Sequence, residues 1–213
     1  MKVKKNYYPD DIYKSVPLDQ IPWNSETPPP LLVELIDSGK IKPGSALDMG
    51  CGAGNYAVYL ASRGFDVTGI DMSPTAVKIA KGNARKKGVK CKFVVGDVTG
   101  DLPEIKGPFD LIYDWGLLHH IMPPDRPAYI RTIHRLLKTG GLYLSMCFNE
   151  ADTAFEGTGK FRPTQFGHRV YLSSEQELRE LWRGLFEVLD FRVFESTGKV
   201  MSHVFNYGLM RRK

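Results

Sequence analysis

The hydrophobic and polar positions along this chain predict an alternation of strands and helices. Five short apolar runs have the length and composition of buried strands: 45–49, 65–70, 92–95, 109–113 and 142–148. Other segments repeat their apolar residues every three or four positions, as on the buried face of a helix: 31–39, 55–63, 74–87 and 127–138. Strands that alternate with helices form parallel sheets covered on both sides. We therefore expect an α/β fold with a doubly wound, Rossmann-like sheet and helices on both faces.

The remaining segments predict how this sheet is completed and covered. Ser174-x-x-Glu177 can form a capping box before a further helix. Strands at 186–195 and 200–209, with a turn at Gly198, predict a C-terminal antiparallel hairpin, which makes the mostly parallel sheet seven-stranded. We expect one domain, 1–213, with two irregular segments: a proline-rich arm, 1–30, that closes over a ligand, and a lid loop, 149–170, on the substrate side.

Composition narrows the classes of protein that fit. A chain of 213 residues, 42% of them hydrophobic, can bury one core without disulfides. We expect no membrane span, because no run approaches the roughly 18 consecutive apolar residues that one needs. The three cysteines lack metal-type spacing and cannot all pair, so we expect no metal site and a cytoplasmic location.

The net charge of +5 has a local origin. Seven of the 29 basic residues lie between Ser73 and Lys92, with no acidic residue among them. Such a run is usually a solvated helix face, so nucleic acid is not the expected partner.

The chemistry concentrates in a glycine-rich loop after the first strand, Asp48-Met49-Gly50-Cys51-Gly52-Ala53-Gly54. Glycines at alternate positions leave no Cβ between the main chain and a ligand at the start of the next helix. The loop matches neither the GxxxxGK[ST] pattern of a phosphate loop nor the GxGxxG pattern of a dinucleotide site. The carboxylate of Asp48 suits a cationic group instead.

Carboxylates stand at the ends of four predicted strands: Asp48, Asp71, Asp97 and Asp114. Asp71 lies 21 residues after Gly50, where a carboxylate can accept hydrogen bonds from two ribose hydroxyls. In open parallel sheets, the ligand crevice lies outside these strand ends. The sequence therefore predicts a pocket for a nucleoside that carries a positively charged chain.

These residues give the chain a resemblance to the class I S-adenosylmethionine-dependent methyltransferases. The segments LDMGCGAG, Asp71, GDV at 96–98, FDLIYDWGLLHH and LKTGGLYLSM resemble successive motifs of that class. Pro22-Trp23 is similar to the N-terminal segment of the thiopurine, thiol and halide methyltransferases, although Asn24 follows where that group tends to have aspartate. The tellurite-resistance type of small methyltransferase is an equally similar relative.

The resemblance implies S-adenosylmethionine as the cofactor, S-adenosylhomocysteine as its product, and roles for the matching residues. Asp48 would lie near the amino end of the cofactor, Asp71 would hold the ribose, and Trp23 would cross the cofactor from the arm. The full set of implied cofactor contacts is Trp23, Asp48, Met49, Gly50, Cys51, Gly52, Gly54, Asp71, Met72, Asp97, Val98, Asp114 and Trp115.

Methyl transfer from a sulfonium is an in-line displacement, so the protein's main contribution is alignment. A base is needed only if the acceptor arrives protonated, and the candidates are Asp114, His119 and His120. We expect a small-molecule acceptor, because the segment after the fourth strand reads Asp-Trp-Gly-Leu instead of the (Asp/Asn)-Pro-Pro-(Tyr/Phe) of amino-methylating nucleic-acid enzymes. An RNA or protein methyltransferase and a non-catalytic cofactor-binding protein are the alternatives. The acceptor and the oligomeric state stay open.

Overall fold

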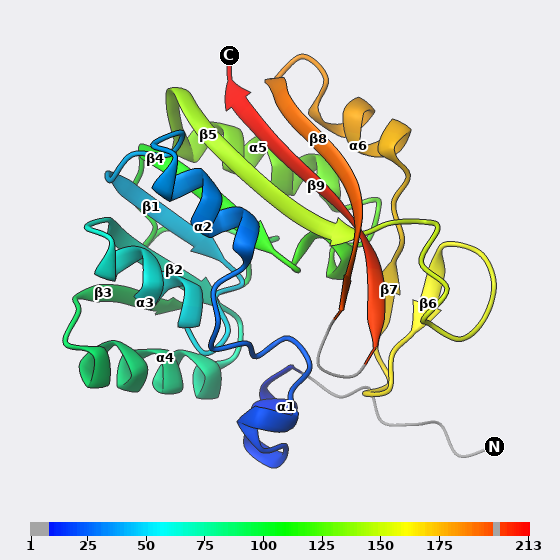
Figure 1. The fold of residues 1–213 in the computed structure, drawn as a ribbon, viewed down its shortest axis with the longest axis horizontal. Helices are drawn as coiled ribbons and strands as arrows, with labels where there is room; N and C mark the ends of the chain where they lie inside the picture. The colour runs from blue at the N-terminus through cyan, green and yellow to red at the C-terminus, as the bar shows by residue number, and fades with distance from the viewer. Residues whose placement is uncertain (1–8, 198–200) are drawn as a thin grey trace.

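Seven strands form one sheet in the order β3-β2-β1-β4-β5-β9-β8 in the computed structural model, which describes residues 9–197 and 201–213 (Figure 1). The first five strands are parallel, and β9 runs antiparallel to both β5 and β8. The strands are β1 (Ser45–Met49), β2 (Asp66–Asp71), β3 (Cys91–Val95), β4 (Phe109–Trp115), β5 (Leu137–Phe148), β8 (Phe186–Thr197) and β9 (Ser202–Arg212). This arrangement confirms the predicted fold class. The turn predicted at Gly198 lies outside the described residues.

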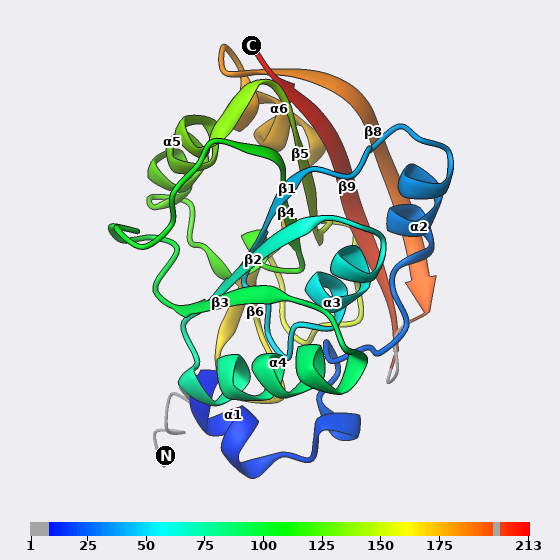
Figure 2. The same ribbon diagram turned by 90° about the vertical axis from the view of Figure 1, so that its left-hand side faces the viewer.

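Helices cover both faces of the sheet, as Figure 2 shows. One face carries α2 (Pro30–Asp37), α3 (Asn55–Ser62) and α4 (Pro74–Lys87), and the other carries α5 (Arg126–Leu136) and α6 (Glu175–Trp182). Neighbouring residues of β1 therefore enter different apolar clusters: Ala46 packs on the α3 side and Leu47 on the α5 side, and both are fully buried. Burial on both faces explains why the strand is a continuous apolar run.

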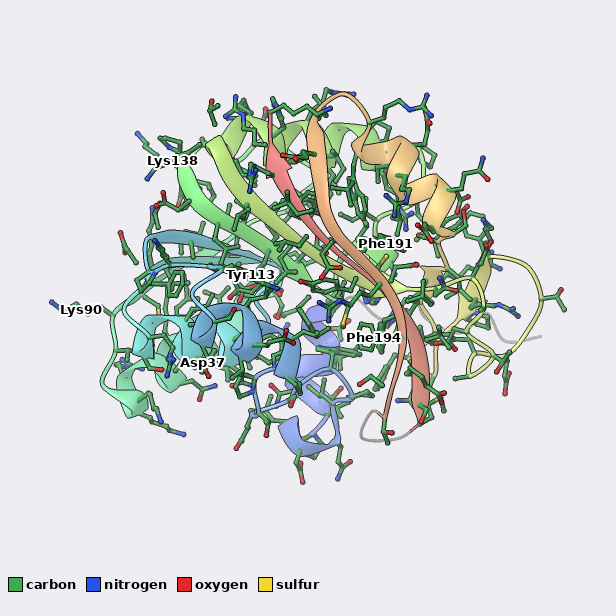
Figure 3. The ribbon with its side chains drawn as sticks, turned by 45° about the horizontal axis from the view of Figure 1, so that its top comes forward. Asp37, Lys90, Tyr113, Lys138, Phe191 and Phe194 are labelled. Atoms are coloured by element: carbon green, nitrogen blue, oxygen red, sulfur yellow. The ribbon has the colours of Figure 1, made fainter. Side chains whose placement is uncertain are left out.

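The helix ends follow the signals in the sequence. The Ser73 hydroxyl accepts a hydrogen bond from the amide of Ala76 at the start of α4, and the helix stops at Gly88, whose φ is 71°. Ser174 and Glu177 form the predicted capping box of α6. Lys90, just past α4, points away from the molecule in Figure 3. The basic side chains on the outer face of α4 are exposed, as expected for a solvated helix face: Lys78, Lys81, Arg85, Lys86 and Lys87.

Three segments differ from the prediction. β5 begins at Leu137 and not at 142, because Gly140 and Gly141 form a bulge inside the strand: Leu137 pairs with Phe109, and Leu142 pairs with Leu111. Segment 149–170 is not wholly irregular, since β6 (Phe161–Pro163) pairs with β7 (Arg169–Tyr171) in a short antiparallel hairpin. The arm contains a helix, α1 (Pro9–Ser15), and a 3-10 turn, η1 (Leu18–Gln20).

The arm is docked on the sheet's helical layer. Asp10 in α1 accepts hydrogen bonds from the Ser73 hydroxyl (2.6 Å) and from the amide of Thr75 (2.9 Å), at the first turn of α4. Ile12 and Tyr13 are buried against Ala53 and Ala76 in a third apolar cluster. The arm therefore lies beside the carboxyl ends of the first strands, which is where the sequence predicts the ligand. Within the described residues, no helix is long and apolar enough to cross a membrane.

Candidate functional site

A cavity of about 330 Å³ opens at the carboxyl ends of β1, β2 and β4, where the strand order reverses. This switch point is where open α/β sheets bind their ligands. Most of the residues predicted from the sequence line it: Trp23, Asp48, Gly50, Cys51, Gly52, Asp71, Met72, Asp97, Val98, Trp115 and His120.

The glycine loop approaches its neighbours too closely to carry side chains. Gly50 and Gly52 have φ values of 74° and 52°, in the left-handed region. A Cβ would come within 2.9 Å of Leu117 Cδ1 at position 50, and within 2.6 Å of the Tyr13 hydroxyl at position 52. The loop therefore presents bare main chain to the cavity, as close ligand approach requires.

Asp71 is held rigidly at the end of β2. Its Oδ2 accepts from the amide of Gly52 (2.8 Å) and its Oδ1 from the amide of Ser73 (2.9 Å). Burial raises the pKa of Asp71, and the hydrogen bonds from these two amides oppose that shift. Each carboxylate oxygen keeps acceptor capacity toward the cavity, because an ionised carboxylate offers about four lone-pair sites.

Asp48 is a carboxylate without a cation. It is 4% exposed, it makes no salt bridge with a described residue, and burial raises its pKa to about 7. The negative charges of Asp71 and Asp114 also raise the pKa of Asp48. Tyr113 is the register partner of Asp48 on β4, and hydrogen bonding by its hydroxyl opposes this rise in the pKa of Asp48. A cationic ligand group fits this environment, because it would stabilise the charged carboxylate.

Three of the predicted cofactor contacts, Met49, Gly54 and Asp114, are not among the residues that line the cavity. Met49 is fully buried on the α5 face together with Leu47. Residues two apart in a strand point to the same face, and Asp48 between them points to the opposite one. Gly54 does not line the cavity; a Cβ there would lie 2.7 Å from that of Ala80, so this glycine allows α3 to pack against α4.

Asp114 is the third of these and was also a candidate base. It is fully buried on the α5 face, where it accepts hydrogen bonds from the hydroxyls of Tyr129, Tyr143 and Ser145. Burial raises the pKa of Asp114 to about 7, and these hydroxyls oppose the shift. Its carboxylate is therefore enclosed by core hydroxyls, and Asp114 is not among the residues that line the cavity.

The two adjacent histidines separate in the same way. Both belong to η2 (Leu118–His120), but only His120 lines the cavity. His119 is 4% exposed, its ring stacks on Phe148 at 4.0 Å, and its Nδ1 has no hydrogen-bond partner in the described chain. Burial lowers the pKa of His119 well below its ordinary value, so the ring is neutral.

Several cavity residues were not predicted. Tyr13, Asn24 and Asn55 line the cavity, and Asn55 donates from Nδ2 to Asn24 Oδ1 at 2.9 Å. Asn55 directly follows the glycine loop, so its position was a usable signal. The arm residues reach the cavity only because α1 docks on α4, which no local pattern reveals.

The cavity mouth joins two distant segments. Trp23 is 42% exposed; its Nε1 donates to the Tyr13 hydroxyl (3.0 Å), and its ring meets Phe166 edge-on at 5.5 Å. His168, from the same hairpin as Phe166, also lines the cavity and lies 5.1 Å from His120 between ring centroids. Arm and hairpin thus meet above the strand ends.

Comparison with known proteins shows which family the chain resembles. A family model described as a methyltransferase domain matches residues 46–141. The 2-heptyl-1-hydroxyquinolin-4(1H)-one methyltransferase of Mycobacteroides abscessus is 36% identical over 162 residues, which are 75% of this chain and 66% of that protein. Thiocyanate methyltransferase 1 of Arabidopsis thaliana is 34% identical over 135 residues, 62% of this chain and 58% of that one. The chain thus spans slightly less than two thirds of these relatives.

The solved structures agree with the fold. A structure described as "Conversion of a Disulfide Bond into a Thioacetal Group during Echinomycin Biosynthesis" has a TM-score of 0.80 and 25% identity, covering 96% of this chain and 90% of that chain. The fold is that of the Rossmann-like methyltransferases. The chain belongs to the family of S-adenosylmethionine-dependent methyltransferases. Solved structures that share the fold at 18% to 22% identity include methyltransferases with bound S-adenosylmethionine or S-adenosylhomocysteine.

Proposed function

We propose that this protein transfers a methyl group from S-adenosylmethionine to a small-molecule acceptor by in-line displacement. The observation that carries the proposal is the cavity itself: a glycine loop, the buried carboxylate of Asp48 and the half-buried carboxylate of Asp71 form one half, and an aromatic mouth covers the other. The relatives named for a hydroxyquinolone and for thiocyanate support a small acceptor.

The described side chains fit the cofactor group by group. Asp71, fixed by the amides of Gly52 and Ser73, would accept hydrogen bonds from the ribose hydroxyls. Asp48 would lie against the amino group of the cofactor, because its buried carboxylate has no cationic partner among the described residues. Gly50, Gly52 and Cys51 would pass under the methionine and ribose. The remaining proposed contacts are Met72, Asp97 and Val98 toward the adenine and Trp115 toward the methionine.

The bound cofactor supplies an activated methyl group on a sulfonium; the chain supplies alignment and shielding from water. Alignment of reacting groups can contribute roughly 7 to 11 kcal/mol. Within a single domain, 1–213, the arm 1–30 would close over the cofactor and the segment 149–170 over the acceptor. The contact between Trp23 and Phe166 supports this arrangement, because it joins the two covers. A cytoplasmic location belongs to the same proposal and is supported by three free cysteines.

Calorimetry with S-adenosylmethionine and S-adenosylhomocysteine tests the cofactor half. We expect saturable binding that weakens roughly 10- to 100-fold in Asp71→Asn, because hydrogen bonds to a charged group contribute about 1.5 to 3 kcal/mol. Asp66→Asn is the matched control, since this exposed residue begins the same strand and lies outside the cavity. Absence of binding, or wild-type affinity in Asp71→Asn, contradicts the proposal.

A screen of labelled methyl transfer tests the acceptor half. The panel holds 2-heptyl-1-hydroxyquinolin-4(1H)-one, thiocyanate, thiols, halides, metalloid oxyanions and bulk RNA. We expect transfer to at least one small molecule. Transfer to RNA alone would replace the proposed acceptor class, and cofactor binding without any transfer would identify a non-catalytic binding protein.

A further inference from the structure

The arm is fastened to the sheet's helical layer by one buried carboxylate, that of Asp10. This side chain is 7% exposed and belongs to α1, which lies beside α4 in Figure 2. Its Oδ1 accepts from the Ser73 hydroxyl at 2.6 Å and from the amide of Thr75 at 2.9 Å. Its Oδ2 forms an ion pair with Lys14, one turn farther along α1. One oxygen therefore binds α4, and the other binds the arm itself.

Asp10 completes the cap of α4. The first amides of a helix have no acceptor within the helix. The Ser73 hydroxyl accepts from the amide of Ala76 at 3.0 Å and also donates to Asp10. Hydrogen bonding to Lys14, and then to the Ser73 hydroxyl, holds the pKa of Asp10 well below its usual range, so the carboxylate is ionised at neutral pH. Docking of the arm thus places a negative charge at the positive end of α4, where it is stabilising.

The same first turn holds the carboxylate proposed to bind the ribose. The amide of Ser73 donates to Asp71 Oδ1 at 2.9 Å, and the amide of Gly52 donates to Asp71 Oδ2 at 2.8 Å. Ser73 therefore contacts Asp10 through its hydroxyl and Asp71 through its amide. A continuous series of hydrogen bonds connects the arm, the start of α4, Asp71 and the glycine loop.

The docked arm also forms a wall of the cavity. Pro9, Ile12 and Tyr13 of α1 line it. The Tyr13 hydroxyl lies 2.6 Å from the place that a Cβ on Gly52 would take, and it accepts from Trp23 Nε1 at 3.0 Å. A ligand in the cavity would therefore contact the arm on one side and the glycine loop on the other.

We propose that Asp10 is a positioning residue that couples docking of the arm to binding of the cofactor. This inference rests on the proposed function, because the ligand of the cavity is taken to be S-adenosylmethionine. With the arm docked, Asp10 orients Ser73, and Ser73 holds Asp71. With the arm released, the cofactor loses the wall formed by Tyr13 and Trp23. Coupling between two binding equilibria is reciprocal, so bound cofactor must stabilise the docked arm as much as the docked arm stabilises bound cofactor.

Two substitutions at Asp10 separate the roles of its two oxygens. Asp10→Ala removes both hydrogen bonds to α4. Asp10→Asn keeps them, because Ser73 and Thr75 both donate to Oδ1, and it loses only the ion pair with Lys14. Asp11→Ala is the matched control: it removes the same charge from the exposed neighbour of Asp10 in α1, which is not among the residues that line the cavity.

Calorimetry with S-adenosylhomocysteine measures the effect of the arm on the cofactor. We expect the dissociation constant to rise roughly 5- to 150-fold in Asp10→Ala, the usual range of coupling between two sites. Asp10→Asn should keep most of the affinity, and Asp11→Ala should bind as tightly as the wild type.

Trypsin cleavage after Lys14 measures the effect of the cofactor on the arm. Lys14 is exposed but lies in α1, so cleavage there follows the population of molecules in which this helix has opened. Saturating S-adenosylhomocysteine should slow this cleavage of the wild type, identified by mass spectrometry, by at least the factor by which Asp10→Ala weakens binding. Asp10→Ala should be cleaved faster, and the ligand should protect it less.

Three results overturn the inference and leave the proposed function intact. They are wild-type affinity in Asp10→Ala, an equal loss of affinity in Asp10→Asn and Asp10→Ala, and wild-type cleavage after Lys14 that the ligand does not slow. A purely structural role for Asp10 gives the first of these, with faster cleavage but unchanged affinity. The cleavage of the wild type needs no variant, so it tests the inference even if Asp10→Ala does not fold. Absence of cofactor binding by the wild type would remove both the inference and the proposed function.

Discussion

The buried carboxyl of Asp48 predicts that cofactor binding releases a proton near neutral pH. The side chain is 4% exposed, it has no salt bridge with a described residue, and burial raises its pKa from 3.8 to about 7. An ammonium group placed against it favours the ionised form and lowers the pKa again. At pH 6 the free protein therefore holds a proton that the complex does not.

The size of the effect follows from the shift. A change from 3.8 to about 7 corresponds to roughly 4 kcal/mol, the upper limit of what a cationic partner can restore at this site. Because the pKa is higher in the free protein than in the complex, affinity is greatest above pH 7 and decreases as the pH falls below it. We expect the dissociation constant of S-adenosylmethionine to be about tenfold higher at pH 6 than at pH 8.

Calorimetry at pH 6.5 in buffers of different ionisation enthalpy measures the released proton directly. The Asp48→Asn variant distinguishes titration of the Asp48 carboxyl from titration of the ligand itself. The affinity of this variant for S-adenosylmethionine should no longer show the pH dependence. 5′-Methylthioadenosine, which lacks the amino group, should release no proton. Equal affinity for S-adenosylmethionine at pH 6 and pH 8, or the same pH dependence in Asp48→Asn, would refute the reasoning.

Three other substitutions test the remaining structure. Asp114→Ala removes the common acceptor of three buried hydroxyls and should lower the free energy of unfolding in urea by about 3 kcal/mol or more, with unchanged cofactor affinity; weakened binding in the folded variant would contradict its placement in the core. Gly54→Ala places a Cβ 2.7 Å from Ala80 at a φ of 74° and should cost about 1 to 3 kcal/mol by calorimetric unfolding; an unchanged melting temperature would show that α3 and α4 can separate. Ser174→Ala loses the capping box and should cost about 0.5 to 2 kcal/mol in the same assay, whereas Ser174→Thr should retain most of it.

Segments governed by local chemistry were predictable. The helix over 74–87 has the bounds expected from the sequence, because Ser73 caps its first amides, Pro74 suits its first turn, and Gly88 adopts the left-handed φ that ends it. The order of elements likewise predicted the sheet, since alternating strands and helices allow few parallel arrangements.

The sequence predicted where the strands end, but not to which face of the sheet the side chains at those ends point. Asp48 and Asp114 both stand at strand tips in the sequence, yet Asp48 lines the cavity and Asp114 lies in the core. The difference comes from strand alternation together with the hydroxyls that α5 and β5 bring to Asp114. Those partners are 15 and 31 residues away, beyond any local pattern.

The sequence by itself determined the class of fold, the glycine loop and the carboxylates Asp48 and Asp71 at the cavity, because each of these depends on neighbouring residues or on spacing within one βα unit. Only the tertiary structure decided which side chains share a space: the arm with the hairpin through Trp23 and Phe166, and Asp152 with His203, which are 51 residues apart. Such contacts follow from how separate elements pack, and the energy of packing is distributed over residues that no single segment contains.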